Sequence, residues 1–468
     1  MQRNRPPTPP PFDPWRSAEA AAEVQAASHA SAEGLAALQA RRLRALLASA
    51  VRDSPLYRGW MKGRDPERLA LQDFPIVRKP QLMRAFDRWV TDPALRLEEV
   101  KRFAADPRRI ADPYLQRYVV WESSGSSGEP GLFVQDAAAM AVYDALEALR
   151  RPTAQPLRRL LDPWLWRERI AFVGATGGHF ASTVSVERLR RLNPMLAQAL
   201  RGVSFLQPVA DMVAELQAFR PTIVATYPTA AVLLGEEQLA GRLRIEPAEI
   251  WTGGETLTSC MRGFVQQAFG CPVSNSYGAS EFLALASECT QRRLHLNSDW
   301  AVLEPVDRLG RPVAPGERGE TTLLTNLANR VQPLIRYDLG DRVTLQPGRC
   351  ACGSALPVIE VEGRCDDSLR LGSGARPVHV LPLALSTVLE DEAGLYDFQL
   401  VQQGPSQLLL RTGLSGQQAE ESLRRGRVAL AAYLSRLGAP RVRIECHCGQ
   451  PAHPGRSGKL QRVIALPA

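Results

Sequence analysis

The sequence predicts an α/β protein with two domains. A large N-terminal domain of mixed sheets with flanking helices and a small β subdomain would precede a small α+β C-terminal domain. Short apolar runs begin near residues 170, 222, 249 and 273, and each ends at a turn rich in Gly, Thr or Pro. Helical patterns separate several of these runs. Such alternation is typical of α/β folds, whose loops at the strand ends build a site.

The N-terminal part of the chain is expected to be helical after a short leader. Residues 1–16 (MQRNRPPTPPPFDPWR) are rich in proline and lack an apolar core, which predicts a disordered leader and no secretion signal. Residues 18–51 carry apolar residues at helical spacing and predict one long helix or two. Short helices joined by Pro-marked turns are expected over 65–112, and another helix over 136–151.

The pattern changes in the last third of the chain. Short apolar runs with Gly and Pro turns over 303–345 predict antiparallel strands. After residue 363, the order strand, helix, strand predicts a separate α+β domain. We therefore expect an N-terminal domain over 17–363 and a C-terminal domain over 364–468.

The composition is that of an ordinary globular protein. Of the 468 residues, 45% are hydrophobic and 23% are charged, and the net charge is +8. The basic residues are scattered along the expected helices, so we expect solvated surfaces and no nucleic-acid partner. No run approaches the roughly 18 apolar residues of a membrane span. Eight cysteines without a secretion signal indicate reduced thiols or metal ligands, and thus the cytoplasm.

A stretch rich in Gly and Ser, WESSGSSGEPG over 121–131, allows two interpretations. Its composition is typical of a linker or a surface turn. Its hydroxyls and glycines would equally allow close backbone approach to a phosphate, although the lysine of a Walker loop is absent. Apolar residues on both sides, at 118–121 and 132–134, predict two strands joined by this stretch.

The order of the later motifs favours phosphate binding. TGGET, YGASE, IRYDLGD, GRCDD and SGKLQRV follow the loop, at 252–256, 277–281, 335–341, 363–367 and 457–463. In this succession the chain resembles the adenylate-forming acyl-CoA synthetase superfamily, and within it the phenylacetate–CoA ligase family. The resemblance covers nearly the whole chain from about Leu43 onward.

This resemblance implies an activity with two steps. In the first, a carboxylic acid would react with ATP, in the presence of bound Mg²⁺, to give acyl-AMP and pyrophosphate. In the second, coenzyme A would take the acyl group. An acyl carrier protein or an amine is the alternative acceptor. A ligand-binding homologue without activity is a third hypothesis, against which the joint presence of Lys459, Glu281 and Asp341 argues. The sequence is compatible with an oligomer.

The resemblance also implies which residues bind the nucleotide. The Ser- and Gly-rich loop would hold the leaving phosphates, Tyr277 would stack on the adenine, and Asp341 would accept from the ribose hydroxyls. Glycines of the TGGET and YGASE motifs would let the backbone approach the nucleotide. The full implied set is Ser123, Ser124, Gly125, Ser126, Ser127, Gly128, Gly253, Gly254, Glu255, Tyr277, Gly278, Asp341 and Arg364.

Three residues are implied in catalysis and one in domain movement. Lys459 would bridge the α-phosphate and the substrate carboxylate, where a compact cation offsets negative charge. Glu281 would hold Mg²⁺, and Ser280 supplies a hydroxyl where the family usually has threonine. Asp366 is the expected hinge about which the C-terminal domain would rotate between the two half-reactions.

The resemblance places the carboxylic acid near loops 175–182 and 226–230. His179 would either face the acyl carboxylate or cap its own loop. Gln135 replaces a tyrosine that phenylacetate-type members carry, which argues against phenylacetate itself. We expect another aromatic acid, such as a benzoate or a heteroaryl carboxylate. The implied substrate residues are Gly178, His179, Tyr227, Gln135 and Ala279.

Cysteine and histidine residues predict a metal site. Cys350 and Cys352 form a close pair on a turn, and Cys289 and His295 lie in another segment. Together they offer the N and S ligands of tetrahedral zinc, which would be structural because four protein ligands leave no open position. The resemblance supports this, since members of the family carry structural zinc at such positions. The alternative is four reduced residues on paired surface loops.

Overall fold

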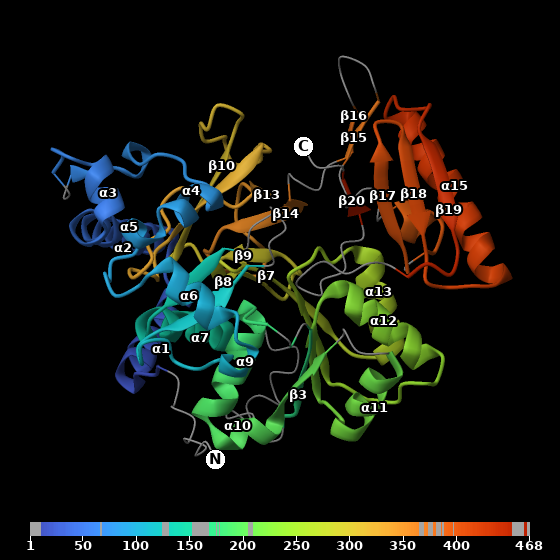
Figure 1. Cartoon of the computed structure of the whole chain (residues 1–468), viewed down its shortest axis with the longest axis horizontal. Coiled ribbons are helices and arrows are strands. Elements are labelled where there is room, and N and C mark those ends of the chain that lie inside the picture. Colours follow the sequence, from blue (N-terminus) through green and yellow to red (C-terminus); the bar gives the residue numbers. More distant parts are fainter. Residues whose placement is uncertain are drawn as a thin grey trace.

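The computed structural model confirms the α/β class (Figure 1). Its largest sheet has nine strands and is mixed, and a four-stranded sheet lies in the C-terminal part of the chain. Among the described residues, no helix is long and apolar enough to cross a membrane. The structure describes residues 11–65, 68–123, 131–151, 168–174, 176, 178–204, 209–364, 369–372, 378–380, 385, 388–395, 397–451 and 463–465.

Helices form the N-terminal part, as the sequence predicts. Helix α1 (Pro14–Ser28) begins within the span expected to be a leader, because the Asp13 carboxylate accepts hydrogen bonds from the first-turn amides. Ser31 caps helix α2 (Ala32–Asp53) in the same way. The elements that follow are α3 (Pro55–Trp60), a 3-10 turn (Leu71–Asp73), α4 (Lys79–Arg84), α5 (Phe86–Trp89), α6 (Leu97–Ala104) and a second 3-10 turn (Pro107–Arg109).

A hairpin joins the two ends of the Ser- and Gly-rich loop. Strands β1 (Val119–Glu122) and β2 (Leu132–Gln135) pair antiparallel, so the expected strand–loop–strand arrangement is confirmed. Helix α7 (Ala137–Arg150) follows, and the Asp136 carboxylate caps it. Helix α7 packs against α1, which places the hairpin beside the N-terminal helices.

The main sheet changes from parallel to antiparallel in its middle. Its strand order is β13-β14-β9-β8-β7-β6-β5-β3-β4, and strands β3 to β7 are parallel while β7, β8, β9, β14 and β13 pair antiparallel. Parallel strands are buried on both faces, which explains the near-continuous apolar runs in the sequence. The strands are β3 (Ile170–Gly174), β4 (Leu200–Ser204), β5 (Ile223–Thr226), β6 (Glu249–Gly253), β7 (Val273–Ala279), β8 (Phe282–Glu288), β9 (Leu294–Leu296), β13 (Asp341–Leu345) and β14 (Val358–Arg364).

Helices alternate with the parallel strands, as the sequence predicts. Figure 1 shows α11, α12 and α13 (green) beside this half of the sheet. Their buried residues form one apolar cluster with β3, β5, β6 and β7. The helices of this region are α9 (Ala181–Leu192), α10 (Pro194–Ala199), α11 (Val209–Phe219), α12 (Pro228–Leu239) and α13 (Ser259–Phe269).

A three-stranded antiparallel sheet follows, in the region where antiparallel strands are expected. It contains β10 (Ala301–Val306), β11 (Thr321–Asn326) and the two-residue strand β12 (Tyr337–Asp338). The expected region 303–345 also includes β13, which pairs instead with β14 in the main sheet. The chain therefore passes directly from the last strand of this small sheet, β12, into β13 at the edge of the large one.

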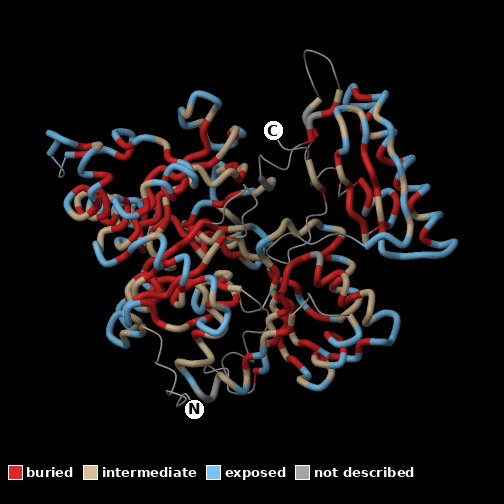
Figure 2. The backbone as a smooth tube through the Cα atoms, in the orientation of Figure 1, coloured by how far each residue is buried: buried red, intermediate tan, exposed pale blue. Residues whose placement is uncertain are grey.

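The C-terminal part has the expected mixture of strands and helices. Its four-stranded sheet has the order β19-β18-β17-β20, and its longest helix, α15 (Gln417–Arg436), packs on that sheet. Its buried apolar residues form a cluster drawn only from residues 369–463, and Figure 2 shows buried strands facing that helix. The remaining elements are β15 (Leu369–Leu371), β16 (Val378–Val380), a π-helical turn (Val388–Glu392), β17 (Gln399–Gly404), β18 (Gln407–Arg411), β19 (Arg443–His447) and β20 (Val463–Ile464).

A buried ionic cluster ties the N-terminal helices together. Asp299 is fully buried and accepts hydrogen bonds from Arg150 of α7 at 2.6 and 2.8 Å. Its second partner is Arg42 of α2, at 3.3 Å, and Arg42 also pairs with Glu23 of α1 at 2.6 Å. The Arg42 guanidinium lies 3.4 Å from the centre of the Trp300 ring. One carboxylate thus joins two helices to the segment before β10.

We expect Asp299→Ala to lower the free energy of unfolding by about 3–5 kcal/mol, because the Arg150 guanidinium would stay buried without its carboxylate. Urea denaturation measures this change. Asp53→Ala is the control, since the Arg52–Asp53 pair is solvent-exposed and is expected to contribute at most about 1 kcal/mol. Equal effects of the two substitutions would contradict the assigned role of Asp299.

Candidate active site

Ser123 closes the two arms of the Ser- and Gly-rich loop. Its backbone N–H donates to the Gly131 carbonyl at 2.8 Å, and its hydroxyl accepts from the Gly131 N–H at 2.8 Å. The Ser123 hydroxyl, which is predicted to contact phosphate, therefore binds the backbone at the base of the loop. Of the predicted phosphate-binding set, Ser124, Gly125, Ser126, Ser127 and Gly128 lie outside the described residues.

Two residues of the YGASE motif are held by contacts from other elements. The Trp121 indole N–H of β1 donates to the Ser280 carbonyl at 2.8 Å. The Asn326 amide of β11 donates to the Glu281 carbonyl at 2.9 Å, and the Tyr337 hydroxyl donates to Glu281 Oε1 at 2.7 Å. Glu281 is buried. Its backbone and its carboxylate are thus both fixed, beside the strand that leads into the Ser- and Gly-rich loop.

The structure brings together the two residues predicted to hold the adenosine. Tyr277, near the end of β7, donates its hydroxyl proton to Asp341 Oδ2 at 2.6 Å. Asp341 begins β13 and lies opposite Arg364 of β14 in the strand register. These three positions come from separate motifs, and the Tyr277–Asp341 hydrogen bond links the end of β7 to the β13–β14 pair at the sheet edge. Of Arg364 the structure describes only the backbone.

Glycines permit the close packing at this turn. A Cβ built on Gly278 would lie 1.8 Å from the Leu283 carbonyl oxygen, well inside contact distance. Gly254 follows β6 with φ near +76°, a left-handed conformation that glycine adopts readily. The predicted Gly253 packs against Ser276 of the neighbouring strand. These glycines are therefore explained by chain packing as well as by approach to a ligand.

Two segments predicted to bind substrate and one predicted to bind the nucleotide converge near Tyr227. Tyr227 stands just before the first residue of α12, and its side chain is buried. Burial raises the pKa of Tyr227 to about 12, the negative charge of Glu255 adds to the rise, and a hydrogen bond with the Ser182 side chain opposes it. Ser182 lies in the first turn of α9 and Glu255 lies in the loop after β6, so these two segments meet at Tyr227.

The structure buries His179 beside helix α6. Its side chain is fully buried, and its ring packs edge-on against Phe103 of α6 with ring centres 5.6 Å apart. Its carbonyl accepts from the Glu122 N–H at 2.7 Å. Burial lowers the pKa of His179, which keeps the imidazole neutral. Its role, at the acyl carboxylate or as a cap of its own loop, stays a prediction.

Gln135 belongs to a buried polar network. Its Oε1 accepts from the Asn329 amide at 2.7 Å, and that amide also donates to the Val134 carbonyl. Two other predicted substrate residues lie at turns: Gly178 packs beside the Phe180 ring, and Ala279 is paired with Phe282 across the β7–β8 turn.

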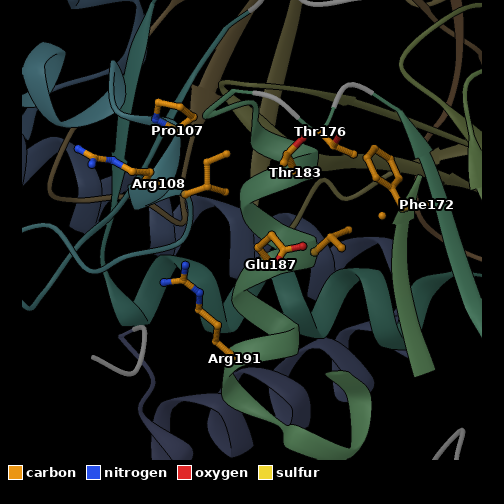
Figure 3. Close-up of a pocket in the computed structure, with 10 residues that line it drawn as sticks. Pro107, Arg108, Phe172, Thr176, Thr183, Glu187 and Arg191 are labelled. Atoms are coloured by element: carbon orange, nitrogen blue, oxygen red, sulfur yellow. The ribbon is translucent and has the colours of Figure 1, made fainter. Parts of the chain in front are cut away.

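A pocket of about 250 Å³ opens beside helix α9 (Figure 3). Thr183, Glu187 and Arg191 line it from one face of this helix, at the spacing of successive helical turns. Phe172 of β3 faces them, and Pro107 lies on the opposite side of the opening. The pocket combines an apolar wall with hydroxyl and charged groups, and pockets that bind small molecules have this mixture.

The predicted metal ligands form one cluster at the edge of the main sheet. The ligand atoms of Cys289, His295, Cys350 and Cys352 lie within 4.8 Å of one another. The Sγ atoms of Cys289 and Cys350 are 3.8 Å apart, and Cys352 Sγ is 3.4 Å from His295 Nε2. Zn–S bonds of about 2.3 Å and a tetrahedral angle give an S–S separation of about 3.8 Å. The cluster therefore has the dimensions of a zinc site.

His295 is oriented for binding a metal through Nε2. Its Nδ1 lies 2.8 Å from the Leu356 carbonyl, an acceptor, which fixes the proton on Nδ1. Burial lowers the pKa of His295 and favours the neutral ring that metals require.

Sequence reasoning missed the residues that support Glu281. Tyr337 lies within the IRYDLGD motif, but its contact with Glu281 was not predicted. Asn326 lies in no motif, and Trp121 opens the Ser- and Gly-rich stretch without an assigned role. Their contacts join strands far apart in the sequence and therefore leave no local signal. Lys459 and Asp366 lie outside the described residues.

Comparisons with known proteins agree with this arrangement. No family model matches the chain. The chain is similar to the phenylacetate-coenzyme A ligase of Escherichia coli (strain K12), at 26% identity over 384 residues that cover 76% of each protein. Protein CapK of Staphylococcus aureus is 28% identical over 134 residues, so this match spans 28% of each protein. The resemblance to phenylacetate–CoA ligases is thus confirmed over most of the chain.

Solved structures confirm the fold. A 2-hydroxyisobutyryl-CoA ligase in its postadenylation state aligns with a TM-score of 0.65 and 19% identity, over 94% of this chain and 91% of that one. The same enzyme in the thioesterification state aligns with a TM-score of 0.54 and 20% identity, over the same shares. The fold is that of adenylate-forming CoA ligases, as the motifs predict.

We expect Gly278→Ala to lower the free energy of unfolding by about 1–3 kcal/mol, because a Cβ would be forced against the Leu283 carbonyl. Thermal and urea unfolding measure this change. Gly263→Ala is the control: it lies in α13 with open space around it, so alanine is expected to stabilise the helix by about 0.5–1 kcal/mol. An unchanged stability of Gly278→Ala would contradict the close packing at this turn.

Proposed function

We propose that this protein is an AMP-forming acid–CoA ligase. One observation carries the proposal: Tyr277 and Glu281, predicted to bind adenine and Mg²⁺, flank the β7–β8 turn, and the Tyr277 hydroxyl bonds Asp341, predicted to bind the ribose. The similarity to phenylacetate–CoA ligase over most of the chain supports the same activity.

In the first half-reaction, a carboxylate oxygen of the acid attacks the α-phosphorus of ATP, and the bond to the bridging oxygen breaks as pyrophosphate leaves. Tyr277 and Asp341 would orient the adenosine, which reduces the entropy cost of reaching the reactive geometry. Lys459 would offset the charge that gathers on the α-phosphate. The carboxylate of Glu281 is a suitable oxygen ligand for Mg²⁺, which would neutralise charge on the phosphates.

In the second half-reaction, the thiol sulfur of coenzyme A attacks the acyl carbon and AMP leaves. We propose that residues 364–468 form a mobile domain that rotates about Asp366 between the two steps. The separate apolar cluster of residues 369–463 supports this proposal, because a domain with its own core can move as a body. Rotation would carry Lys459 toward the acid for adenylation and away from it for thioester formation.

We propose that the tail of the acid occupies the pocket beside α9. The start of this helix is anchored near the site, since the Glu122 N–H donates to the His179 carbonyl, two residues before the helix, and Ser182 in its first turn contacts Tyr227. A volume of about 250 Å³ suits a small acid, and the wall formed by Phe172 favours an aromatic ring. The buried Gln135 takes no place in this pocket.

The proposed activity is tested by ATP–pyrophosphate exchange with a panel of benzoate and heteroaryl acids, followed by addition of coenzyme A. We expect exchange with at least one acid and formation of its CoA thioester. Exchange without a thioester would show that the acceptor is a carrier protein or an amine. If no acid supports exchange, the protein is not an adenylating enzyme.

The same assay on Lys459→Ala tests the proposed division of labour between the half-reactions. We expect at least a hundredfold loss of exchange, of the order seen when one charge-stabilising donor is removed. Thioester formation from supplied acyl-AMP is expected to stay within about threefold of wild type. An equal loss of both steps would contradict the domain rotation.

We also propose that Cys289, His295, Cys350 and Cys352 hold a structural zinc ion. The spacing of their ligand atoms and the orientation of His295 fit this metal. The site would join the turn between β8 and β9 to the turn between β13 and β14, where β9 and β14 share only two paired positions. Zinc would therefore secure the strand that leads into the C-terminal domain.

Elemental analysis is expected to find about one zinc per chain in the wild type. The double substitution Cys350→Ser/Cys352→Ser should lose the metal and lower the melting temperature by several degrees, while Cys260→Ser, on the half-exposed start of α13, should change neither. A wild-type protein that contains no zinc and keeps its melting temperature after chelation would contradict the proposal.

A further inference from the structure

We infer that Tyr337 is a positioning residue for the proposed adenylation: its hydroxyl fixes the carboxylate of Glu281 in the orientation in which it meets a divalent cation. This inference rests on the proposed function and assigns a role to a residue that would not itself touch ATP.

The tyrosine ring is held firmly by its own strand. Tyr337 is buried in β12, pairs with Leu324 of β11 on one side, and forms an isolated bridge with Val77 on the other. The Val77 N–H donates to the Arg336 carbonyl at 3.1 Å, and the Asp338 N–H donates to the Val77 carbonyl at 2.9 Å. A strand of two residues is thus secured from both edges, which fixes the main chain from which the buried ring projects.

The backbone of Glu281 is fixed independently. Asn326 is fully buried, and its amide donates to the Glu281 carbonyl at 2.9 Å and to the Tyr143 hydroxyl at 2.8 Å. With the main chain held there, the remaining freedom of Glu281 lies in its side-chain torsions. A glutamate side chain loses considerable rotamer entropy when it becomes ordered. The bond from Tyr337 restricts these torsions before any cation binds.

The chemistry of the donor suits this role. A tyrosine hydroxyl is neutral, so it orients one carboxylate oxygen without cancelling the negative charge that attracts a cation. A lysine or arginine in the same place would compete with the cation for that charge. Because a carboxylate has two oxygens and several lone pairs, Oε1 can accept from Tyr337 while the group still binds a metal.

The test compares Tyr337→Phe with the wild type in two assays. The first measures, by electron paramagnetic resonance, the Mn²⁺ dissociation constant of the complex with α,β-methylene-ATP, an analogue that cannot transfer its AMP group to an acid. The second measures the Mg²⁺ dependence of ATP–pyrophosphate exchange. Loss of one net hydrogen bond predicts a weakening of cation binding of about five- to tenfold in both assays. At saturating Mg²⁺, kcat and the KM of the acid should remain within about twofold.

Tyr57→Phe is the matched control. Tyr57 is also a buried tyrosine, and its hydroxyl donates to the Pro333 carbonyl at 3.0 Å, away from Glu281. The control is expected to keep the wild-type cation dependence in both assays. The melting temperature without metal, measured for both variants, separates a general loss of packing from a change at the carboxylate.

Two results would overturn the inference. One is unchanged cation affinity in Tyr337→Phe; the other is a loss of affinity that Tyr57→Phe shares and that follows the melting temperature. A wild-type protein that binds Mn²⁺ with the analogue but gives no exchange with any acid refutes the ligase proposal alone, and the first assay still decides the role of Tyr337. A wild-type protein that binds neither Mn²⁺ nor the analogue refutes both the ligase proposal and the role of Tyr337.

Discussion

The candidate site depends on the close passage of two chain segments at the β7–β8 turn, where Gly278 packs against the Leu283 carbonyl. At this point the sheet changes from parallel to antiparallel, and the register shifts between Tyr277 and Ala279. Tyr277 lies at this shift, and its hydroxyl donates to Asp341 of β13, the strand at the edge of the sheet. Ligands in open α/β sheets bind where strand order or direction changes, because loops there diverge and leave a crevice.

The fold was largely predictable from the sequence, for physical reasons that can be named. Parallel strands buried on both faces leave apolar runs, as at Ile170 and Ile223, and turns with glycine end them. The path of β13 was not predictable, because joining the main sheet depends on its pairing with β14 and on no local pattern. Helix α1, capped by Asp13, likewise begins within residues 1–16, the span whose composition predicted a disordered leader.

The site was predictable to the extent that its residues lie in motifs. Tyr277 and Asp341 were named from the sequence, and the structure brings them within hydrogen-bond distance. The four metal-binding candidates were named as well and lie together. The environment of His179 could not be read from its loop, because the ring packs on Phe103, which is remote in the sequence. Support from Tyr337 was hidden for the same reason, since side-chain contacts between distant strands leave no local signal.

The central claim is that adenosine binds at the hydrogen-bonded pair of Tyr277 and Asp341. A crystal structure with a sulfamoyl analogue of an aryl adenylate tests it most directly. The account predicts the adenine against the Tyr277 ring, both ribose hydroxyls on the Asp341 carboxylate, and the aryl group in the pocket beside α9. Adenosine bound elsewhere, with no contact to Tyr277 or Asp341, would contradict it.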